Sequence, residues 1–356
     1  PVHRLGAGWV VVDRQRAEHP ETGATLVQVS ADAAELTVPM ARPLTLRITV
    51  DRSTYAGAAP VVTTDAAAEA MSALVVGAAG GTVPTVTDGR ATVTAAWDPD
   101  LVADHAGVTG ASVPVHPVPD VLVGLAWPSV FAVLGDASTA DGTPVIEGML
   151  DLVHLDHAIR LTGTMPATPT DLQITSVLDS IEDTDFGRVV AVDVTISTAS
   201  GDVAVLRERF AIRGRTGAGQ LADPDRAGGS LGADVRDTPR KSRGSASLVA
   251  PTDLRAFAAV TGDHNPIHTS VAAARLAGLG DPIVHGMWIS AAAQQVVSDR
   301  RITGWTTRFM SPLAPGAPVS IQADRVGLDA GAEVVDVTVR SGGDVVMSAT
   351  ARLEAP

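Results

Sequence analysis

The sequence predicts an α+β protein that contains two copies of one unit, each a curved antiparallel sheet wrapped around a central helix. Three observations lead to this prediction. The chain contains an internal repeat, an apolar helix is expected at about 286–298, and four strand-like runs separated by short turns follow that helix. Consecutive strands with short connections pair antiparallel, and a helix that is apolar nearly all round must be covered by other elements.

The internal repeat is a series of four matches that occur in the same order in the two halves of the chain. Val108–His116 lies without gaps on Val260–His268, and Trp127 then aligns with Trp288. Further along, 192–196 matches 335–339 and 201–203 matches 343–345. Such ordered self-similarity indicates a duplicated structural unit.

The matches divide the chain into four parts. We expect a first copy at 91–214, a linker rich in Gly, Asp, Pro and Arg at 215–244, and a second copy at 245–356. Residues 1–90 are interpreted as a third, degenerate copy, with strands at 9–13, 25–30 and 44–50 and a helix at 66–76 capped by Thr64 or Asp65.

The second copy has the clearest element signals. Ser270 is a candidate N-cap for a short helix at 271–277, and Gly278 is suited to the position that follows the helix. Strands are predicted at 303–309, 319–326, 334–340 and 345–353, because apolar runs there are separated by Gly-containing turns.

The composition excludes several classes of protein. Lys and Arg number 26 against 40 Asp and Glu, so the net charge is −14 at pH 7, and nucleic acid is disfavoured as a partner. There are no cysteines, which excludes disulfides and thiolate metal sites and is compatible with a cytoplasmic protein. Apolar stretches such as 73–79 are short and interrupted by Gly, so no membrane association is expected. The chain begins without Met, and we interpret it as a piece of a longer polypeptide.

The strongest chemical motif is Thr261-Gly262-Asp263-His264-Asn265-Pro266-Ile267-His268. Pro266 keeps Asn265 extended, so the turn can direct Asp263 and His268 into one cavity, where a carboxylate and an imidazole form an acid/base pair. An Asx-turn Asp with a hydrogen-bonded loop His is the structural alternative, and the motif alone leaves both interpretations open.

The repeat favours the functional interpretation. The first copy keeps Gly110, Pro114 and His116 but has Ala111 at the position of Asp263. One copy therefore retains the scaffold without the carboxylate, which indicates that Asp263 is not needed for folding.

A second candidate is His285-Gly286 at the start of the apolar helix. Unpaired N–H groups and a partial positive charge at a helix N-terminus suit a developing oxyanion, and Gly286 permits close approach of a ligand. His285 is interpreted as a core or capping residue rather than a catalytic one. The first copy has Gly124-Leu125 at these positions.

Two histidine pairs do not support a metal site. Pro266 prevents the continuous helix that would bring His264 and His268 together as zinc ligands. His154 and His157 fall in a strand-like run, where strict alternation places them on opposite faces.

The motif at 259–268, followed by His285-Gly286-Met287, resembles the MaoC-like dehydratases and (R)-specific enoyl-thioester hydratases, which have the hot-dog fold. The whole chain is similar to the dehydratase region of a bacterial type I fatty acid synthase. The resemblance implies that Asp263 and His268 are the catalytic dyad, that the Gly286 N–H binds the thioester oxygen, and that Asn265 supports the turn.

The implied reaction converts a (3R)-hydroxyacyl thioester to the trans-2-enoyl thioester and water, as in a 3-hydroxyacyl-[acyl-carrier-protein] dehydratase. No cofactor or metal is implied, and the expected partners are an acyl carrier protein domain and other domains of a larger synthase. Three alternatives remain. They are a free-standing (R)-specific enoyl-CoA hydratase, a non-catalytic acyl-binding scaffold, and a hot-dog thioesterase, for which 286–298 lacks the usual carboxylate.

Overall fold

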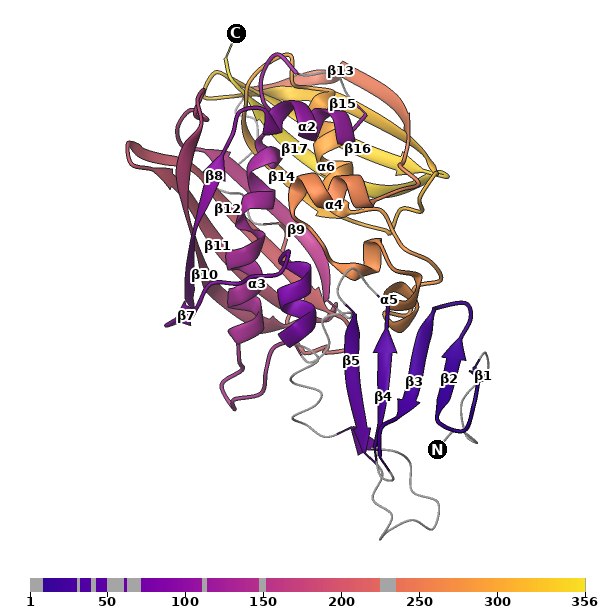
Figure 1. Ribbon diagram of the computed structural model, residues 1–356. Helices are drawn as coiled ribbons and strands as arrows, with labels where there is room; N and C mark the ends of the chain where they lie inside the picture. Colours follow the sequence, from indigo (N-terminus) through magenta and orange to yellow (C-terminus); the bar gives the residue numbers. More distant parts are fainter. Residues whose placement is uncertain are drawn as a thin grey trace.

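The computed structural model describes residues 9–30, 33–39, 43–49, 61–62, 72–110, 114–146, 152–224 and 235–355. They form an α+β protein with a six-stranded and an eleven-stranded antiparallel sheet (Figure 1). The larger sheet contains the duplicated unit, and the smaller one lies beside it at the N-terminal end of the chain.

The second copy has the predicted plan of a sheet around a helix. Its sheet order is β14-β17-β16-β15-β13, and α6 lies against the inner face. Ser270 caps the short helix α5 by accepting a hydrogen bond from the Ala273 N–H, and Gly278 has a positive φ of 75°, as predicted. The elements are β13 (Val235–Val249), α4 (Arg255–Thr261), η4 (Pro266–His268), α5 (Val271–Leu276), α6 (Gly286–Gln295), β14 (Ile302–Phe309), β15 (Pro318–Asp329), β16 (Ala332–Ser341) and β17 (Asp344–Leu353).

The first copy repeats this plan, which confirms the duplication. Its sheet order is β9-β12-β11-β10-β8, matching the second copy strand for strand, and a two-residue strand β7 extends the edge. The repeated segments 192–196 and 335–339 lie in β11 and β16 respectively. The elements are β7 (Val86–Thr87), β8 (Arg90–Trp97), α2 (Leu101–Val108), η2 (Pro119–Ala126), α3 (Trp127–Asp136), β9 (Leu152–Leu161), β10 (Thr170–Asp183), β11 (Arg188–Thr198) and β12 (Gly201–Ile212).

The two sheets are joined edge to edge through β9 and β14. These strands pair antiparallel, with Ile159 opposite Trp305, and both side chains are buried. Because each copy covers the other's open edge, neither β9 nor β14 presents unpaired backbone groups to solvent. One continuous apolar core runs across the junction and contains both central helices.

The central helical run of the first copy, Pro119–Asp136, is longer than its counterpart. It is apolar and long enough to match a membrane span by length and composition, but 72% of it is buried inside the protein. Its side chains pack in the shared core, with Leu122, Val130 and Leu134 fully buried.

The prediction of a degenerate third copy at 1–90 is wrong for the described residues. Six strands form a meander in sequence order, and the helical segment 72–78 does not pack across them. Leu74, Val75 and Ala78 instead join the core of the duplicated unit. The predicted cap at Thr64 or Asp65 lies outside the described residues. The strands are β1 (Val10–Val11), β2 (Arg16–His19), β3 (Ala24–Gln28), β4 (Ala33–Val38), β5 (Leu44–Thr49) and β6 (Val61–Val62).

The predicted linker 215–244 is too long at its C-terminal end. Residues 235–244 belong to β13, which pairs with β15 at the edge of the large sheet. Most side chains of β13 are exposed, so the strand lacks the apolar alternation of its neighbours. Charged residues such as Arg240 and Lys241 suit an exposed edge, where they discourage pairing with other chains.

Candidate active site

The predicted catalytic turn connects α4 to η4 and is fixed by its own hydrogen bonds. Gly262 ends α4 in the left-handed conformation with φ of 72°. The carboxylate of Asp263 accepts a hydrogen bond from the Asn265 N–H at 3.1 Å, and Asn265 Oδ1 accepts one from the Ile267 N–H at 3.3 Å. Asn265 therefore supports the turn, as expected from the resemblance.

His268 is the last residue of η4, and its side chain is buried. Its Nδ1 lies 2.8 Å from the Ile283 carbonyl oxygen, which can only accept, so Nδ1 carries the proton and Nε2 has the lone pair in the neutral ring. Burial lowers the pKa of His268, although the nearby Asp263 carboxylate acts in the opposite direction. A neutral imidazole with a free Nε2 is suited to act as a general base.

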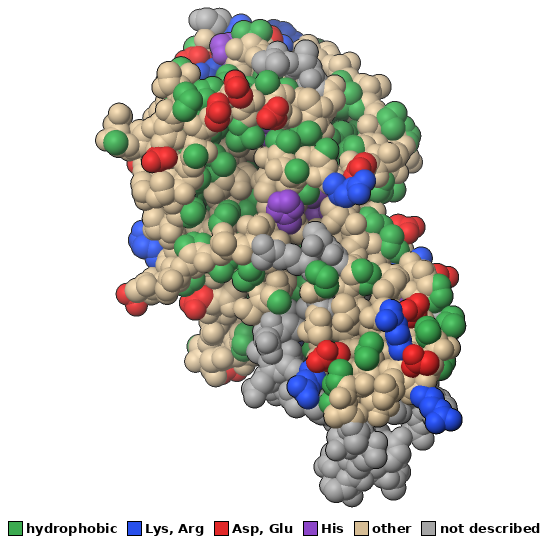
Figure 2. Space-filling view, in the orientation of Figure 1, with side chains coloured by type: hydrophobic (Ala, Val, Ile, Leu, Met, Phe, Trp, Pro, Cys, Tyr) green, Lys and Arg blue, Asp and Glu red, His purple; other side chains and the backbone are tan. Residues whose placement is uncertain are grey.

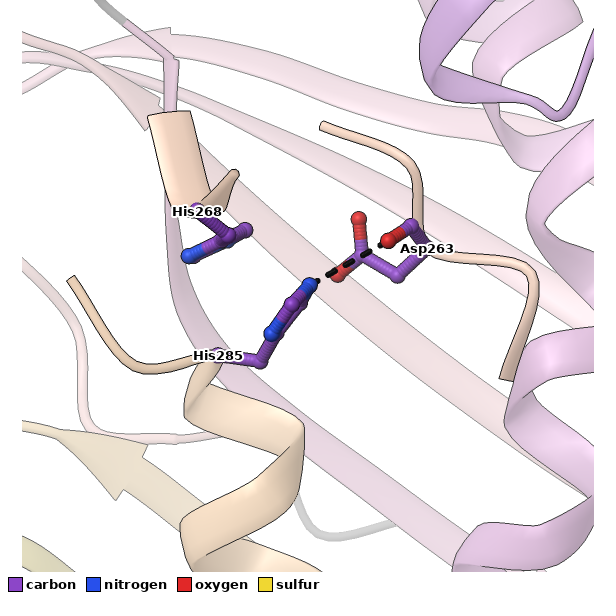
Figure 3. Close-up of side chains that lie close together, drawn as sticks. All are labelled: Asp263, His268 and His285. Atoms are coloured by element: carbon purple, nitrogen blue, oxygen red, sulfur yellow. Dashed lines mark hydrogen bonds between the residues drawn. The ribbon is translucent and has the colours of Figure 1, made fainter. Parts of the chain in front are cut away.

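His285 lies directly behind His268, with the ring centroids 3.9 Å apart and the planes at 28° (Figure 3). It is fully buried, and its Nε2 lies 3.2 Å from the backbone oxygen of Asp263. Burial lowers its pKa well below the ordinary value, and His268 adds to this effect. His285 is thus a neutral core residue that packs against the dyad, as predicted.

Asp263, His268 and His285 also form a group of three in which one potential metal-ligating atom from each side chain lies close to the other two. These three atoms all lie within 4.8 Å of one another. Hydrogen bonds to backbone oxygens already engage one ring nitrogen on each histidine.

Gly286 is the first residue of α6, and no side chain caps this end of the helix. The first N–H groups of a helix have no partner within it, so the Gly286 N–H can donate to a ligand. A Cβ at Gly286 would lie 3.0 Å from ring carbons of Phe309, so a larger residue here would crowd that ring.

The predicted site residues Asp263, Asn265, His268 and Gly286 all line one cavity of about 250 Å³. Its wall comes from both copies. The first copy contributes the aromatic residues Trp127, Phe131, Phe186 and Phe210, and the second contributes Met287, Ile289, Phe309 and Leu313. The sequence places the dyad in the second copy alone, but residues of both copies form the cavity.

The first copy lacks an equivalent helix N-terminus. Helix α3 is preceded by the helical turns of η2, so the backbone at Gly124 and Leu125 lies inside a helical run. Gly124 has a different purpose, because a Cβ there would lie 2.1 Å from the Thr261 carbonyl oxygen. The glycine lets the first copy pack directly beneath the catalytic turn. Ala111 lies outside the described residues.

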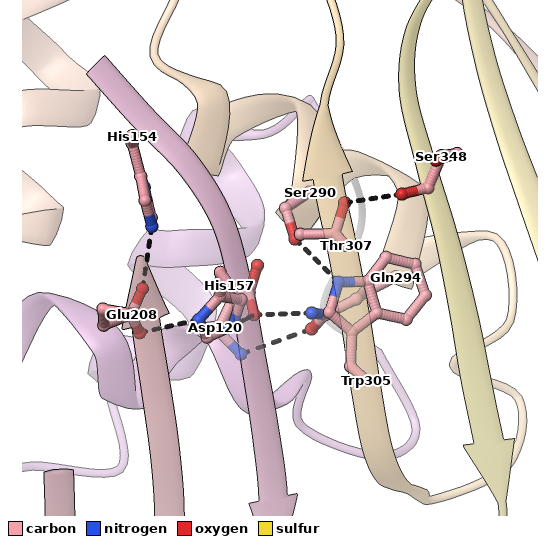
Figure 4. Close-up of polar contacts among 9 residues, drawn as sticks. All are labelled: Asp120, His154, His157, Glu208, Ser290, Gln294, Trp305, Thr307 and Ser348. Atoms are coloured by element: carbon pink, nitrogen blue, oxygen red, sulfur yellow. Dashed lines mark hydrogen bonds and ion pairs between the residues drawn. The ribbon is translucent and has the colours of Figure 1, made fainter. Parts of the chain in front are cut away.

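The prediction that His154 and His157 face opposite sides is wrong. Strand β9 contains a β-bulge at Leu155, because the consecutive residues Arg209 and Phe210 of β12 pair with Asp156 and His154. Both histidines consequently bond the same buried carboxylate, with His154 Nε2 at 2.8 Å and His157 Nδ1 at 2.7 Å from Glu208 (Figure 4). Sequence reasoning missed Glu208, although its place on the same strand face as the apolar Leu206 and Phe210 was a detectable signal.

Two family models match separate parts of the chain. A MaoC-like domain model matches residues 233–347, and a model of the fatty acid synthase SBS domain matches residues 1–81. The second match accounts for the distinct N-terminal sheet, which the sequence interpretation had taken as a third copy.

Curated relatives agree with these matches. The chain is 34% identical over 119 residues to the fatty acid synthase beta subunit stcK of Emericella nidulans, covering 31% of this chain and 6% of that protein. It is 40% identical over 67 residues to 3-hydroxyacyl-thioester dehydratase X of Mycobacterium tuberculosis, covering 18% of this chain and 24% of that one. The chain thus spans only a small part of these relatives.

Solved structures share the fold. HtdX of Mycobacterium tuberculosis has a TM-score of 0.57 at 22% identity and covers 74% of this chain and 100% of its own. A MaoC-like dehydratase from Phytophthora capsici has a TM-score of 0.58 at 18% identity and covers 75% of this chain and 95% of its own.

The fold is a tandem hot-dog, and the second copy, which holds Asp263 and His268, matches the MaoC-like domain. More particularly, the chain combines a match to the MaoC-like domain with a match to the fatty acid synthase SBS domain, and in this it is similar to a fatty acid synthase dehydratase region.

Proposed function

We propose that this chain is a 3-hydroxyacyl-[acyl-carrier-protein] dehydratase of fatty acid synthesis, which converts a (3R)-hydroxyacyl thioester to the trans-2-enoyl thioester and water. The observation that carries the proposal is the convergence of Asp263, His268 and the start of α6 at Gly286 on one cavity. A carboxylate, a neutral imidazole and a backbone N–H are the groups that this elimination requires.

The Gly286 N–H donates to the thioester oxygen and stabilises the negative charge that develops when the C2 proton leaves. His268 Nε2 accepts that proton, and the C2–H electron pair forms the C2–C3 double bond. The C3–O bond breaks, and the hydroxyl leaves as water when the dyad passes to it, through Asp263, the proton that His268 accepted. The dyad accepts one proton and delivers one, so its net protonation is unchanged after each turnover.

The substrate reaches the dyad through a wider hollow on the surface. Its walls include His268, Thr252, Asp281 and Pro312, and its volume is about 820 Å³. Histidine side chains reach the surface near the middle of the face drawn in Figure 2. Arg255 is the one Lys or Arg that lines the hollow among the described residues, and Asp253 pairs with it at 2.6 Å. A phosphopantetheine arm attached to a protein suits this opening better than the multiply phosphorylated coenzyme A.

The proposal includes an acyl carrier domain and other synthase domains as partners and a cytoplasmic location. Its test is a mass-spectrometric assay of the purified chain with (3R)- and (3S)-hydroxyacyl groups on carrier protein, coenzyme A and free pantetheine. We expect loss of water from the (3R) substrates, with the highest kcat/KM for the carrier protein. Equal or better use of the coenzyme A thioester would favour a free-standing hydratase, and no turnover of any substrate would contradict the enzyme assignment.

Catalysis is also proposed to be independent of metal, since the acid/base dyad and the helix N-terminus supply all the electrophilic help. Prolonged chelation followed by desalting should leave the dehydration rate unchanged. The same sample, analysed by elemental mass spectrometry, tests the cluster of Asp263, His268 and His285. About one bound zinc per chain, with activity lost on its removal and restored on its return, would overturn the mechanism.

A further inference from the structure

The first copy contributes a hydrogen-bonding side chain to the aromatic part of the catalytic cavity. His154 of β9 lines the cavity together with the dyad of the second copy. Three aromatic rings surround it, with centroid distances of 4.9 Å to Phe210, 5.1 Å to Phe309 and 5.8 Å to Trp127. His154 is thus a polar ring within an aromatic part of the wall.

The orientation of His154 is fixed from behind by buried charges (Figure 4). Its Nε2 lies 2.8 Å from Glu208, whose other oxygen bonds His157, and His157 in turn lies 3.2 Å from Asp120. Gln294 of α6 donates to the same Asp120 oxygen at 2.6 Å, so the cluster also joins the two copies.

These bonds decide which nitrogen of His154 is available. Burial alone would raise the pKa of Glu208, but His157 and His154 lower it to about 2, so Glu208 is a carboxylate that can only accept. His154 Nε2 must therefore donate. Its Nδ1 has no hydrogen-bond partner among the described residues and is not sealed off from the cavity that the ring lines.

The contacts place His154 beyond the reacting carbons of the substrate. The Phe309 ring lies against Gly286, where the thioester oxygen is bound, and His154 is the next ring along the wall. A substrate with its C2 and C3 between Asp263 and His268 would then lay its acyl tail along Phe309 toward His154.

We propose that His154 is a specificity-determining residue that contacts the acyl tail; this inference rests on the proposed function. A saturated tail that covers Nδ1 removes its water without offering a hydrogen bond, which disfavours that tail by about tenfold or more. A tail with a hydroxyl group at this position gains a partner among the aromatic rings of Trp127, Phe210 and Phe309. The chemical class selected at this point is therefore an acyl chain that ends before His154 or bears a hydroxyl beside it.

The wild-type protein provides the first test. Pairs of (3R)-hydroxyacyl pantetheine thioesters with equal numbers of heavy atoms, one ending in a methyl and the other in a hydroxyl group, are compared at increasing chain length. We expect the hydroxyl-to-methyl ratio of kcat/KM to stay below about 0.1 at most lengths, since an apolar wall leaves the hydroxyl unpaired. At the length that reaches His154 the ratio should rise about tenfold. A ratio without such a maximum would overturn the inference.

Variants then assign the maximum to this side chain. His154→Leu should abolish the maximum and raise kcat/KM for methyl-ended tails of that length and longer by about tenfold. His154→Gln retains an amide donor for Glu208 and should keep a maximum. His116→Leu makes the same chemical change in the first copy outside the cavity wall and should leave the whole profile unaltered. A maximum that survives in His154→Leu would overturn the assignment.

The two proposals fail separately. If no thioester is dehydrated, the proposed function is wrong, whereas dehydration without a maximum contradicts only the role of His154. If His154→Leu does not fold, as judged by circular dichroism and thermal unfolding, the wild-type length series still tests the inference, because a ratio without a maximum overturns it.

Discussion

The two hot-dog copies have the same strand order but differ at the start of the central helix. In the second copy α6 begins at Gly286 with a free helix N-terminus at the cavity, whereas in the first copy the helical turns of η2 run into α3. The first copy has thereby lost the electrophilic end of its helix but kept the packing of the helix in the sheet. Within a duplicated chain, one copy can therefore keep the packing of the central helix in the sheet without keeping the helix N-terminus that serves the chemistry.

A second difference lies in equivalent strand pairs. His157 faces Glu208 between β9 and β12, and Thr306 faces Thr350 at the corresponding place between β14 and β17. The first copy therefore holds a buried imidazole–carboxylate pair where the second has two hydroxyl groups. This pair orients His154, so the copy without a complete dyad still supplies polar groups to the cavity.

Separating the two copies should have the largest effect on solubility and dehydration activity. The fragment 235–356 contains all of β13 and every proposed catalytic residue, but it exposes the edge of β14 and loses the aromatic wall from the first copy. We expect an insoluble or inactive fragment, because an unpaired edge promotes aggregation and the cavity is incomplete. Size-exclusion chromatography with the dehydration assay checks this. A monomeric fragment with full activity would show that the first copy is only a neighbour.

Removing the dyad should affect activity without affecting the fold. Asp263→Asn and His268→Ala should each lower kcat by about 10²–10⁴-fold, the usual contribution of a general acid or base. His116→Ala, at the repeat position that corresponds to His268, should retain wild-type turnover. The measurement is steady-state dehydration of a (3R)-hydroxyacyl thioester, with thermal unfolding as the check on folding. Full activity of either dyad variant would refute the assignment.

Charging the repeated strand should destabilise both copies alike. Val194 and Val337 are each 1% exposed at equivalent places in β11 and β16. Asp at either position buries an unpaired carboxylate and should lower the free energy of unfolding by several kcal/mol. Urea unfolding followed by tryptophan fluorescence measures the effect. If Val194→Asp is tolerated while Val337→Asp is not, the two copies do not share one cooperative core.

The sequence was sufficient wherever a local rule determines the structure. The Asn265-Pro266 turn, the Ser270 cap and the Gly-containing hairpins of the second copy depend on neighbouring residues, and the repeat extended these signals to the first copy. The positions of Asp263 and His268 at the cavity followed from the same turn chemistry.

Features that depend on register and on distant contacts were not predictable in this way. A bulge is not encoded in the alternation of β9, so His154 and His157 were placed on opposite faces. Strand β13 was taken as linker because an exposed edge strand has no apolar face to recognise. The contact of Gly124 with Thr261 joins residues from different copies, and no spacing along the chain indicates it.

The smallest effect on stability should come from replacing the buried His157–Glu208 pair of the first copy with two threonines, as found at the equivalent place in the second copy. Burial alone would lower the pKa of His157, but Glu208 and Asp120 raise it to about 10, while the pKa of Glu208 is lowered to about 2. The contribution of protonated His157 to the free energy of unfolding is fully present below its ordinary pKa of 6.5 and is lost as the pH rises toward 10. The contribution of ionised Glu208 to the free energy of unfolding is fully present above its ordinary pKa of 4.5 and is lost as the pH falls toward 2.

The double variant His157→Thr/Glu208→Thr removes both titrations and keeps His154 and Asp120. At pH 5.5 its free energy of unfolding should differ from that of the wild type by no more than about 3 kcal/mol, because desolvation offsets much of the attraction in a buried ion pair. The advantage of the wild type should be greatest between pH 4.5 and 6.5 and should shrink on both sides of this range. Urea unfolding of the two proteins at matched pH values gives this difference directly. An advantage that rises with pH up to about 6.5 and stays level above it would mean that His157 is neutral in the folded protein, and the ionic pair would then be refuted.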